Sequence, residues 1–142
     1  MVQQTPISNA TFLEVAPFFL VDDVFASAEY YRDKLGFAFD TFFGQPPSFV
    51  MLQRNTTRLM LRQAPANARP VARPNPDRMP HALDCYFWVS DVDALAEEFR
   101  KRGADIVEGP FDSDGGPGRR EMLVRDLNGY LLCFGRVLGW PE

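Results

Sequence analysis

The chain has 142 residues, of which 46% are hydrophobic, and a formal net charge of −4. This length and apolar content predict one domain with a substantial core, and the acidic balance argues against a nucleic-acid or anionic-membrane surface. No apolar run approaches the roughly 20 residues that span a bilayer, and Met1–Ala10 lacks the features of a signal peptide, so we expect a cytoplasmic protein.

The first half of the chain predicts one strand, one helix and then three strands. Leu13–Val21 is rich in the aromatic and β-branched residues that favour strands. Asp23 follows, where a carboxylate can accept hydrogen bonds from the first amides of a helix, and Gly36 is suited to end that helix. The three strand-like runs that follow are Ala38–Phe43, Phe49–Arg54 and Arg58–Gln63.

The second half predicts the same order of elements. It follows a connector, residues 64–80, whose five prolines prevent it from joining a central strand. Ala82–Ser90 predicts a strand, Asp91 the start of a helix and Gly103 its end. The last strand-like runs are Asp105–Glu108, Arg120–Arg125 and Tyr130–Arg136.

The two halves are related in sequence as well as in order. A shift of 68 positions aligns Ala16–Arg32 with Asp84–Arg100, and eight of these seventeen positions are identical. The sequence therefore predicts a single domain over 1–142 made of two copies of a βαβββ unit. Module 1 covers about 12–63, the connector 64–80 and module 2 about 81–137.

The repeated segments resemble a known family. Val21-Asp22-Asp23, Tyr30–Asp33 and Leu35-Gly36-Phe37 look like the opening signature of the vicinal oxygen chelate superfamily, which includes glyoxalase I, extradiol dioxygenases and bleomycin-resistance proteins. The second copy is similar at Val89–Leu95 and Arg125–Tyr130. The resemblance extends from about Leu13 to Arg136. It implies an α+β fold in which two tandem βαβββ modules form a curled mixed-sheet cup, with the helices outside and the ligand inside.

Strand alternation predicts which side chains face that cup. Residues that alternate along a strand share one face, and the apolar parity should meet the helices. We assign Phe19, Val21, Phe87, Val89, Leu59, Leu61, Leu132 and Phe134 to the helix side. The opposite parity then places these side chains in the cup: Ala16, Phe18, Leu20, Asp84, Tyr86 and Trp88 from the first strands, and Arg58, Met60, Arg62, Leu131 and Cys133 from the last.

The metal site of the superfamily is predicted to be lost. The resemblance implies a His or Glu seven residues before each helix-starting Asp, and a Glu on each last strand; these positions hold Ala16, Asp84, Met60 and Cys133. Such a set is poor for zinc, iron or manganese. The only histidine, His81, should lie on the other strand face. We therefore predict no metal, no cofactor and no catalytic residue.

What remains is a predicted binding pocket. Aromatic side chains with a few charges suit a planar or extended aromatic ligand, which gains further if it is cationic, and an antibiotic is one candidate. Asp84 either anchors the ligand or pairs with Arg62 or a neighbouring arginine. The predicted ligand-binding residues are Phe18, Leu20, Phe43, Phe49, Met60, Arg62, Asp84, Tyr86, Trp88, Met122 and Cys133.

Two other interpretations stay open. The protein can be a lyase, isomerase or dioxygenase with a divergent metal site around Asp84 and Cys133, or a scaffold whose cup is filled by its own side chains. Metal-free sequestration of a ligand, as in bleomycin-resistance proteins, is preferred. The resemblance also implies a homodimer. Cys85 and Cys133 are expected to be buried reduced thiols, the loops 44–48 and 112–118 to form the rim, and Trp140 to close the cup or to pack at an interface.

Overall fold

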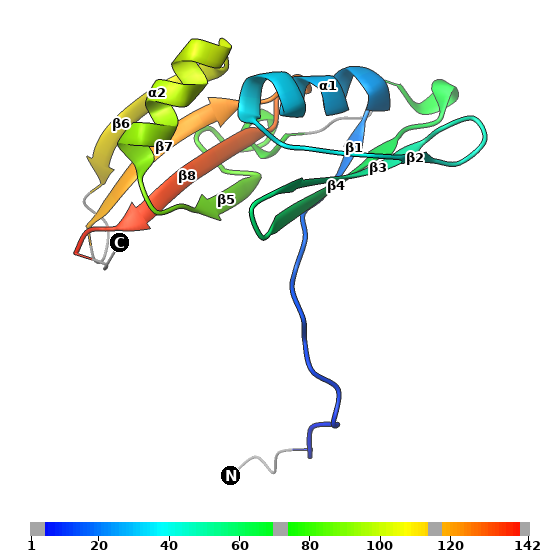
Figure 1. The fold of residues 1–142 in the computed structure, drawn as a ribbon, viewed down its shortest axis with the longest axis horizontal. Helices are drawn as coiled ribbons and strands as arrows, with labels where there is room; N and C mark the ends of the chain where they lie inside the picture. Colours follow the sequence, from blue (N-terminus) through cyan, green and yellow to red (C-terminus); the bar gives the residue numbers. More distant parts are fainter. Residues whose placement is uncertain (1–4, 70–73, 114–117, 140–142) are drawn as a thin grey trace.

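Module 1 forms a four-stranded mixed sheet with one helix (Figure 1). The computed structural model describes residues 5–69, 74–113 and 118–139, so most of the glycine-rich rim segment and Trp140 lie outside the described residues. The strands lie in the order β1-β4-β3-β2, with β1 parallel to β4 and the other pairs antiparallel. The elements are β1 Phe18–Val21, α1 Val24–Leu35, β2 Phe42–Phe43, β3 Phe49–Arg54 and β4 Thr57–Gln63.

Module 2 repeats this topology. Its strands lie in the order β5-β8-β7-β6, again with the first strand parallel to the last. The elements are β5 Cys85–Trp88, α2 Val92–Arg102, β6 Asp105–Ser113, β7 Arg119–Arg125 and β8 Leu131–Val137. The connector contributes two short 3-10 helices, η1 Ala66–Ala68 and η2 Asn75–Asp77. The predicted α+β fold of two tandem βαβββ modules is confirmed.

Both helices begin and end where the sequence predicts. The Asp23 carboxylate accepts hydrogen bonds from two first-turn amides of α1, and the Asp91 carboxylate accepts one from α2. Gly36 ends α1 in the left-handed conformation, with φ of 72°, which residues with a Cβ adopt at a cost. None of the helices in the described residues is long and apolar enough to cross a membrane.

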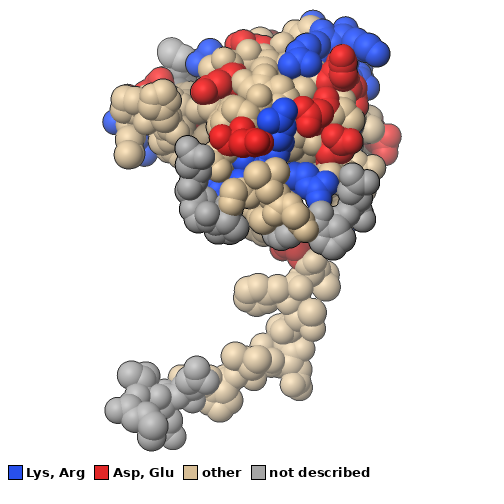
Figure 2. Space-filling model, turned by 90° about the vertical axis from the view of Figure 1, so that its left-hand side faces the viewer, with Lys and Arg blue, Asp and Glu red and all other residues tan. Residues whose placement is uncertain are grey.

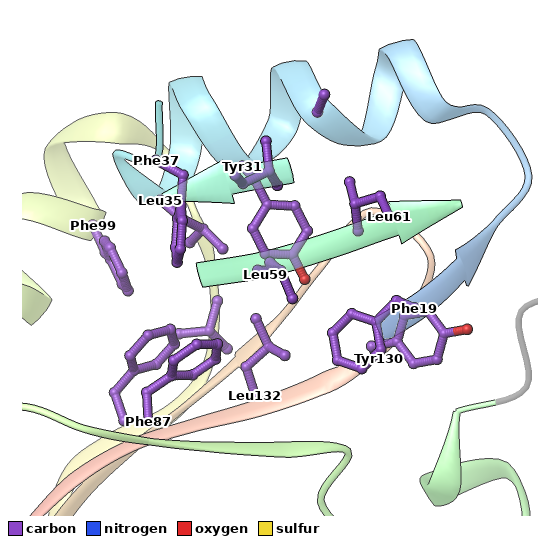
Figure 3. Packing of buried hydrophobic residues seen from close by; sticks show 14 of the residues in the cluster. Phe19, Tyr31, Leu35, Phe37, Leu59, Leu61, Phe87, Phe99, Tyr130 and Leu132 are labelled. Carbon is purple, nitrogen blue, oxygen red and sulfur yellow. The ribbon is translucent and has the colours of Figure 1, made fainter. Parts of the chain in front are cut away.

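The core lies between the helices and the sheets and is shared by the two modules. Figure 1 shows both helices on the same side of the sheets. Phe19 stacks on Tyr130 with ring centroids 4.4 Å apart, and Phe37 meets Phe87 edge to face at 6.3 Å, so each pair joins module 1 to module 2 (Figure 3). The residues assigned to the helix side that lie buried in this core are Phe19, Val21, Leu59, Leu61, Phe87, Leu132 and Phe134.

A buried carboxylate also joins the modules. The Tyr31 hydroxyl of α1 donates to the Asp126 carboxylate at 2.7 Å, while the amides of Asn128 and Tyr130 donate to its other oxygen at 2.9 and 3.0 Å. Burial raises the pKa of Asp126 to about 6, although these hydrogen bonds favour the charged form. The turn before β8 is thereby fixed to the helix of the other module.

An ion pair at the C-terminal end of α1, one turn beyond Tyr31, makes a second link. The Arg54 guanidinium, at the end of β3, contacts both carboxylate oxygens of Glu98 in α2 at 2.7 and 2.8 Å and donates to the carbonyl of Leu35. The hydrogen bond from Arg54 lowers the pKa of Glu98. This two-point geometry makes the pair stronger than an ordinary surface ion pair.

Several predicted strand boundaries differ from the structure. The predicted strand Ala38–Phe43 is a strand only at Phe42–Phe43, with an isolated bridge at Ala38, and the predicted Ala82–Ser90 is shorter, at Cys85–Trp88. The first strand covers only Phe18–Val21, because Pro17 donates no backbone hydrogen bond and the chain before it leaves the sheet. Residues 13–15, predicted as strand, are exposed and extended. Strand β6 continues to Ser113, further than predicted, because it bulges around Gly109, whose φ of 102° a residue with a Cβ rarely adopts.

Candidate functional site

The sheet surface that the helices leave uncovered, here called the open face, is apolar in module 1. Phe18 on β1 pairs with Met60 on the adjacent strand β4, and Phe49 and Met51 continue the same face on β3. Phe18 keeps 49% of its surface exposed, an unusual amount for a large apolar side chain on a strand. The predicted residues that share this face are Phe18, Leu20, Phe43, Phe49, Met60 and Arg62.

The open face of module 1 carries two arginines on β4, and one of them lies over an aromatic ring. Arg62 places its guanidinium 5.7 Å from the ring centroid of Phe49, within the range of a cation-π interaction. Phe49 in turn lies between the rings of Phe18 and Phe43, at 6.2 and 6.1 Å. Arg58, at the same parity on β4, pairs with Glu14 at 3.5 Å. The open face of module 1 therefore offers an aromatic surface bordered by cations.

In module 2 the open face carries an aromatic pair. The rings of Tyr86 and Trp88 lie 4.5 Å apart, and Trp88 keeps 55% of its surface exposed. The Tyr86 ring covers Gly135 on β8 so closely that an added Cβ there would lie 2.1 Å from the hydroxyl oxygen. Gly135 is thus the residue that leaves room for the tyrosine. The two rings together offer an aromatic surface on which a ligand could stack, beside the point where Tyr86 covers Gly135.

The Tyr86 hydroxyl is buried and makes no hydrogen bond within the described part of the chain. Loss of solvent by burial, together with the Glu121 carboxylate beside it, raises the pKa of this phenol well above its ordinary value. The hydroxyl is therefore protonated at neutral pH and has an unused donor. Most buried polar groups are paired, so an unpaired one calls for a partner from outside the chain.

Glu121 is a charged residue of this face that the sequence analysis did not single out. It lies on β7 with only 7% of its surface exposed, and its Oε2 is 3.2 Å from Nε of Arg119. Burial opposes its ionisation, but the nearby polar groups of Tyr86 and Arg119 outweigh burial and lower the pKa. The available signal was weak, because Glu121 follows two arginines in β7 and the apolar residues Met122, Leu123 and Val124 that come after it occupy both parities.

Both cysteines are unpaired, as predicted. Cys133 is buried on β8 and points at Oε2 of Glu121 from 3.6 Å, whereas Cys85 is half-buried. Burial, followed by the nearby carboxylate, raises the pKa of Cys133 to about 12 and that of Cys85 to about 11. Both thiols therefore stay protonated at neutral pH, which makes them poor nucleophiles.

Asp84 accepts two backbone hydrogen bonds rather than pairing with an arginine. Its Oδ1 takes the amide of Asn75 in the connector at 2.7 Å, and its Oδ2 takes the amide of Leu131 at the start of β8 at 2.8 Å. The expected arginine partner is therefore replaced by the backbone. Asp84 holds the connector against the last strand, which is a structural use of its charge.

Met122 does not lie with the other predicted ligand-binding residues. It pairs with Phe134 and is fully buried in the core that the helices cover. The prediction of Met122 as a ligand contact is therefore wrong, since Glu121 and Leu123 occupy the open side of β7. Met122 stabilises module 2 and has no surface to offer a ligand.

The four positions that the superfamily uses for metal do not fit a metal ion here. Ala16 has no donor atom, Met60 offers only a thioether, and both oxygens of Asp84 hold backbone amides. Cys133 is protonated and points at Glu121. Among the described residues, no group of three or more His, Cys, Asp or Glu side chains is arranged to hold a metal ion.

Two cavities lie at the edges of the open faces of the two modules, and neither connects one face to the other. One of about 370 Å³ lies between the modules, beside Trp88, with core aromatics as its floor and the Arg54–Glu98 pair at its rim. Another of about 440 Å³ lies beside β2 and β3 and includes Phe43 and Met51. Neither of these two cavities brings the predicted binding residues together, so over the described residues they lie on an open surface.

The surface over α2 and β6 is mixed in charge. Arg120 contacts Asp93 at 2.9 Å and Asp112 at 3.0 Å, and Figure 2 shows acidic and basic side chains interspersed on this side. A surface that binds nucleic acid gathers positive charge on one side. This side of the molecule intersperses both signs of charge (Figure 2) and so does not have the pattern of a nucleic-acid-binding surface.

Known proteins match this chain through its fold and family. The model of the glyoxalase/bleomycin resistance protein/dioxygenase superfamily matches residues 12–134. No curated protein matches the chain in sequence. Its fold is similar to that of a bleomycin-binding protein from Streptomyces verticillus, solved with copper(II)-bleomycin, at 24% identity and a TM-score of 0.63, covering 88% of this chain and 96% of that one.

Two further solved structures support the same fold. A glyoxalase/bleomycin resistance protein/dioxygenase from Alicyclobacillus acidocaldarius is 17% identical with a TM-score of 0.66, over 92% of both chains. TioX from Micromonospora sp. ML1 is 24% identical with a TM-score of 0.62, over 88% of this chain and all of that one. By the match of its family model over 12–134, this chain belongs to the glyoxalase/bleomycin resistance protein/dioxygenase superfamily.

Proposed function

We propose that this protein binds a planar or extended aromatic molecule on its open face, without a metal ion of its own and without changing the ligand chemically. The proposal is carried by the contrast between the metal positions of the superfamily, which have lost their donor set, and the aromatic side chains of the open face, which remain exposed. The positions that hold metal in the superfamily lack a usable donor set, whereas Phe18 on β1 and Trp88 on β5 each stay about half exposed. Exposed aromatic rings next to a few polar groups are typical of small-molecule sites.

The polar part of this site is Tyr86 with Glu121, in place of Asp84. The Tyr86 hydroxyl has a free donor, and the Glu121 carboxylate remains ionised beside it. A ligand that lies on Trp88 and offers an acceptor to Tyr86 would satisfy that buried hydroxyl, and a cationic ligand would also meet Glu121. This arrangement supports an aromatic ligand with a hydrogen-bonding or cationic group.

The bleomycin-binding neighbour makes bleomycin the first ligand to test, although identity of 24% carries over the fold alone. We expect calorimetric titration of metal-free and copper-loaded bleomycin to show binding. The variant Trp88→Ala should weaken it about tenfold, because a stacked aromatic pair contributes roughly 0.5–1.5 kcal/mol beyond the apolar area that it buries. The control is Phe25→Ala, which removes a similarly exposed aromatic ring of α1, away from the open face.

The outcomes separate the proposal from its alternatives. Equal affinity of both variants would place the ligand elsewhere, and no binding of bleomycin or other aromatic antibiotics would remove the sequestering function. Metal analysis by mass spectrometry of untagged protein decides the enzyme alternative: one metal per chain would mean that the donor assignment is wrong. Expression in a sensitive bacterium should raise resistance to the bound drug, and fractionation should find the protein in the cytoplasm.

We also propose that two chains form a homodimer through their open faces. Phe18, Leu20, Phe43 and Met51 each keep 40% or more of their surface exposed on one side of module 1. An apolar surface of this kind is typical of an interface. A second copy would convert each open face into an enclosed pocket. Light scattering coupled to size exclusion should give twice the chain mass, and a monomer at all concentrations would contradict this.

A further inference from the structure

The two modules meet at two places that the internal repeat relates to each other. At each place, the turn between the last two strands of one module lies against the first strand and the helix of the other. The turn 126–130 of module 2 contacts β1 and α1, and the turn 55–56 of module 1 lies beside β5 and α2 (Figure 1). The two interfaces can therefore be compared position by position.

The interface on α1 is sealed by polar contacts. The Tyr31 hydroxyl donates to the Asp126 carboxylate at 2.7 Å, and the side-chain amide of Asn128 donates to Oγ of Ser27 at 3.0 Å. The backbone amide of Asp22 donates to Oδ1 of Asn128 at 3.4 Å. Both helix residues, Ser27 and Tyr31, are fully buried, so the turn of module 2 closes this interface.

The related interface on α2 lacks the groups for such a seal. The shift of 68 positions places Leu95 at the position of Ser27 and Phe99 at that of Tyr31, and neither carries a hydroxyl. Within the described residues, the side chains of the turn 55–56 make no hydrogen bond to α2. The counterpart of the sealed interface is instead the cavity of about 370 Å³.

This cavity has an aromatic base and a polar mouth. Phe87 stacks on Phe134 with ring centroids 4.8 Å apart, and Phe99 meets Phe134 edge to face at 5.2 Å (Phe87 and Phe99 are labelled in Figure 3). At the mouth, Thr57 of module 1 and Ser90 of module 2 are exposed. The volume falls within the range of roughly 300–1,000 Å³ that small-molecule pockets have, and apolar walls with a few polar groups are typical of them.

The charged groups around the cavity already have partners within the protein. Both carboxylate oxygens of Glu98 contact the Arg54 guanidinium, and the Asp91 carboxylate accepts the amide of Ala94 at 3.0 Å. A ligand with a full charge would lose its hydration here without gaining an unpaired counter-charge. An uncharged ligand avoids this cost and still buries its rings against the aromatic base.

We propose that this cavity binds a small uncharged aromatic molecule with one hydrogen-bonding group, at a site separate from the open face. The ring system lies on Phe87 and Phe99, and its polar group bonds to Thr57 or Ser90 at the mouth. The ligand thus joins the turn of module 1 to α2, as Asp126 joins the turn of module 2 to α1. The inference does not depend on the function proposed for the open face.

The test is calorimetric titration with indole, an uncharged bicyclic ring with one N–H donor. The variant Ala94→Leu places a larger side chain at the cavity, from an exposed position in the first turn of α2, and leucine suits a helix. The parent chain should bind indole with a dissociation constant below about 1 mM, and A94L should raise it more than about tenfold. The matched control is Ala26→Leu, at the repeat-related position of α1 outside the cavity, which should bind indole like the parent.

Amide chemical shifts in ¹⁵N-labelled protein identify where indole lies. Indole should move the amide signals of Thr56, Ser90 and Ala94, which border the cavity. Shifts confined to the open face, at Phe18 and Met60, would overturn the proposal. Equal indole affinity of A94L and A26L, or no shift at any amide up to the solubility limit of indole, would overturn it as well.

Two further titrations test the ligand class and the separation of the sites. Indole-3-acetate carries the same rings with a negative charge and should bind more than about tenfold more weakly than indole, so equal or tighter binding would overturn the assigned class. A94L should bind bleomycin like the parent chain, and a joint loss of bleomycin and indole binding would overturn the separation. A parent chain that binds indole in the cavity but no bleomycin would support this inference and remove only the sequestering function.

Discussion

Substitution of Asp126 by Asn should remove a pH dependence that the fold builds into its own stability. The folded protein holds the Asp126 proton up to about pH 6, whereas an unfolded chain releases it near the ordinary pKa of 3.8. Between these values the folded state binds more protons, so its stability falls as pH rises. The difference of about two units corresponds to about 3 kcal/mol, at 1.36 kcal/mol per unit.

The comparison with D126N isolates this one group, because all other carboxylates titrate in both proteins. Asn can still accept from the amides of Asn128 and Tyr130 and can donate to the Tyr31 hydroxyl oxygen. Urea unfolding followed by circular dichroism, at one fixed protein concentration, gives the free energy of unfolding of each protein. The advantage of the parent chain over D126N should shrink by roughly 3 kcal/mol between about pH 4 and pH 7.5.

The reverse slope would refute the reasoning. If the hydrogen bonds from Tyr31, Asn128 and Tyr130 outweighed burial, the folded pKa would lie below 3.8, and the advantage of the parent chain would grow as pH rises. A difference that does not change with pH would mean that Asp126 titrates alike in the folded and unfolded states. Either result would show that solvation of this carboxylate had been misjudged.

Two further substitutions test particular contacts. Tyr86→Phe should raise the free energy of unfolding by about 1 kcal/mol in urea, because it removes a buried hydroxyl without a hydrogen bond, and a loss of that size would reveal a partner for it. Gly36→Ala should cost about 1–2 kcal/mol more than Gly139→Ala in the same assay. Both glycines have positive φ, but only at Gly36 would the added Cβ lie 2.6 Å from Arg54 Nη1 and displace its ion pair, so equal losses would contradict this account.

The residues around Tyr86 and Glu121 show where strand alternation predicts the exposed face of a strand and where it does not. Alternation assigned Tyr86 and Trp88 to the open face because Phe87 and Val89, at the other parity, were assigned to the helix side. Met122 was predicted as a ligand contact without a parity for its strand, and Glu121 was overlooked, because the apolar residues of Arg119–Arg125 occupy both parities and do not mark one face. The pairing with β8 decides the matter, since Met122 lies opposite Phe134 on the helix side.

The sequence by itself determined the duplicated fold. Local physics is sufficient there: an Asp before each helix, a Gly after it and the apolar stripe between them specify the same βαβββ unit twice, and the alternation of Leu59 and Leu61 specifies which side meets the helix. The absence of a usable donor set at the metal positions can likewise be read directly from the residue types at 16, 60, 84 and 133.

Only the tertiary structure decided how the polar groups are used. Asp84 is satisfied by the amides of Asn75 and Leu131, which a sequence does not place together, and Tyr86 lies over Gly135 from a different strand. Such contacts depend on the register between strands far apart in the chain, and one residue of slippage reverses every side chain. The segment before β1 is similar, because only the folded structure shows that Phe12 is almost fully exposed in the described part of the chain.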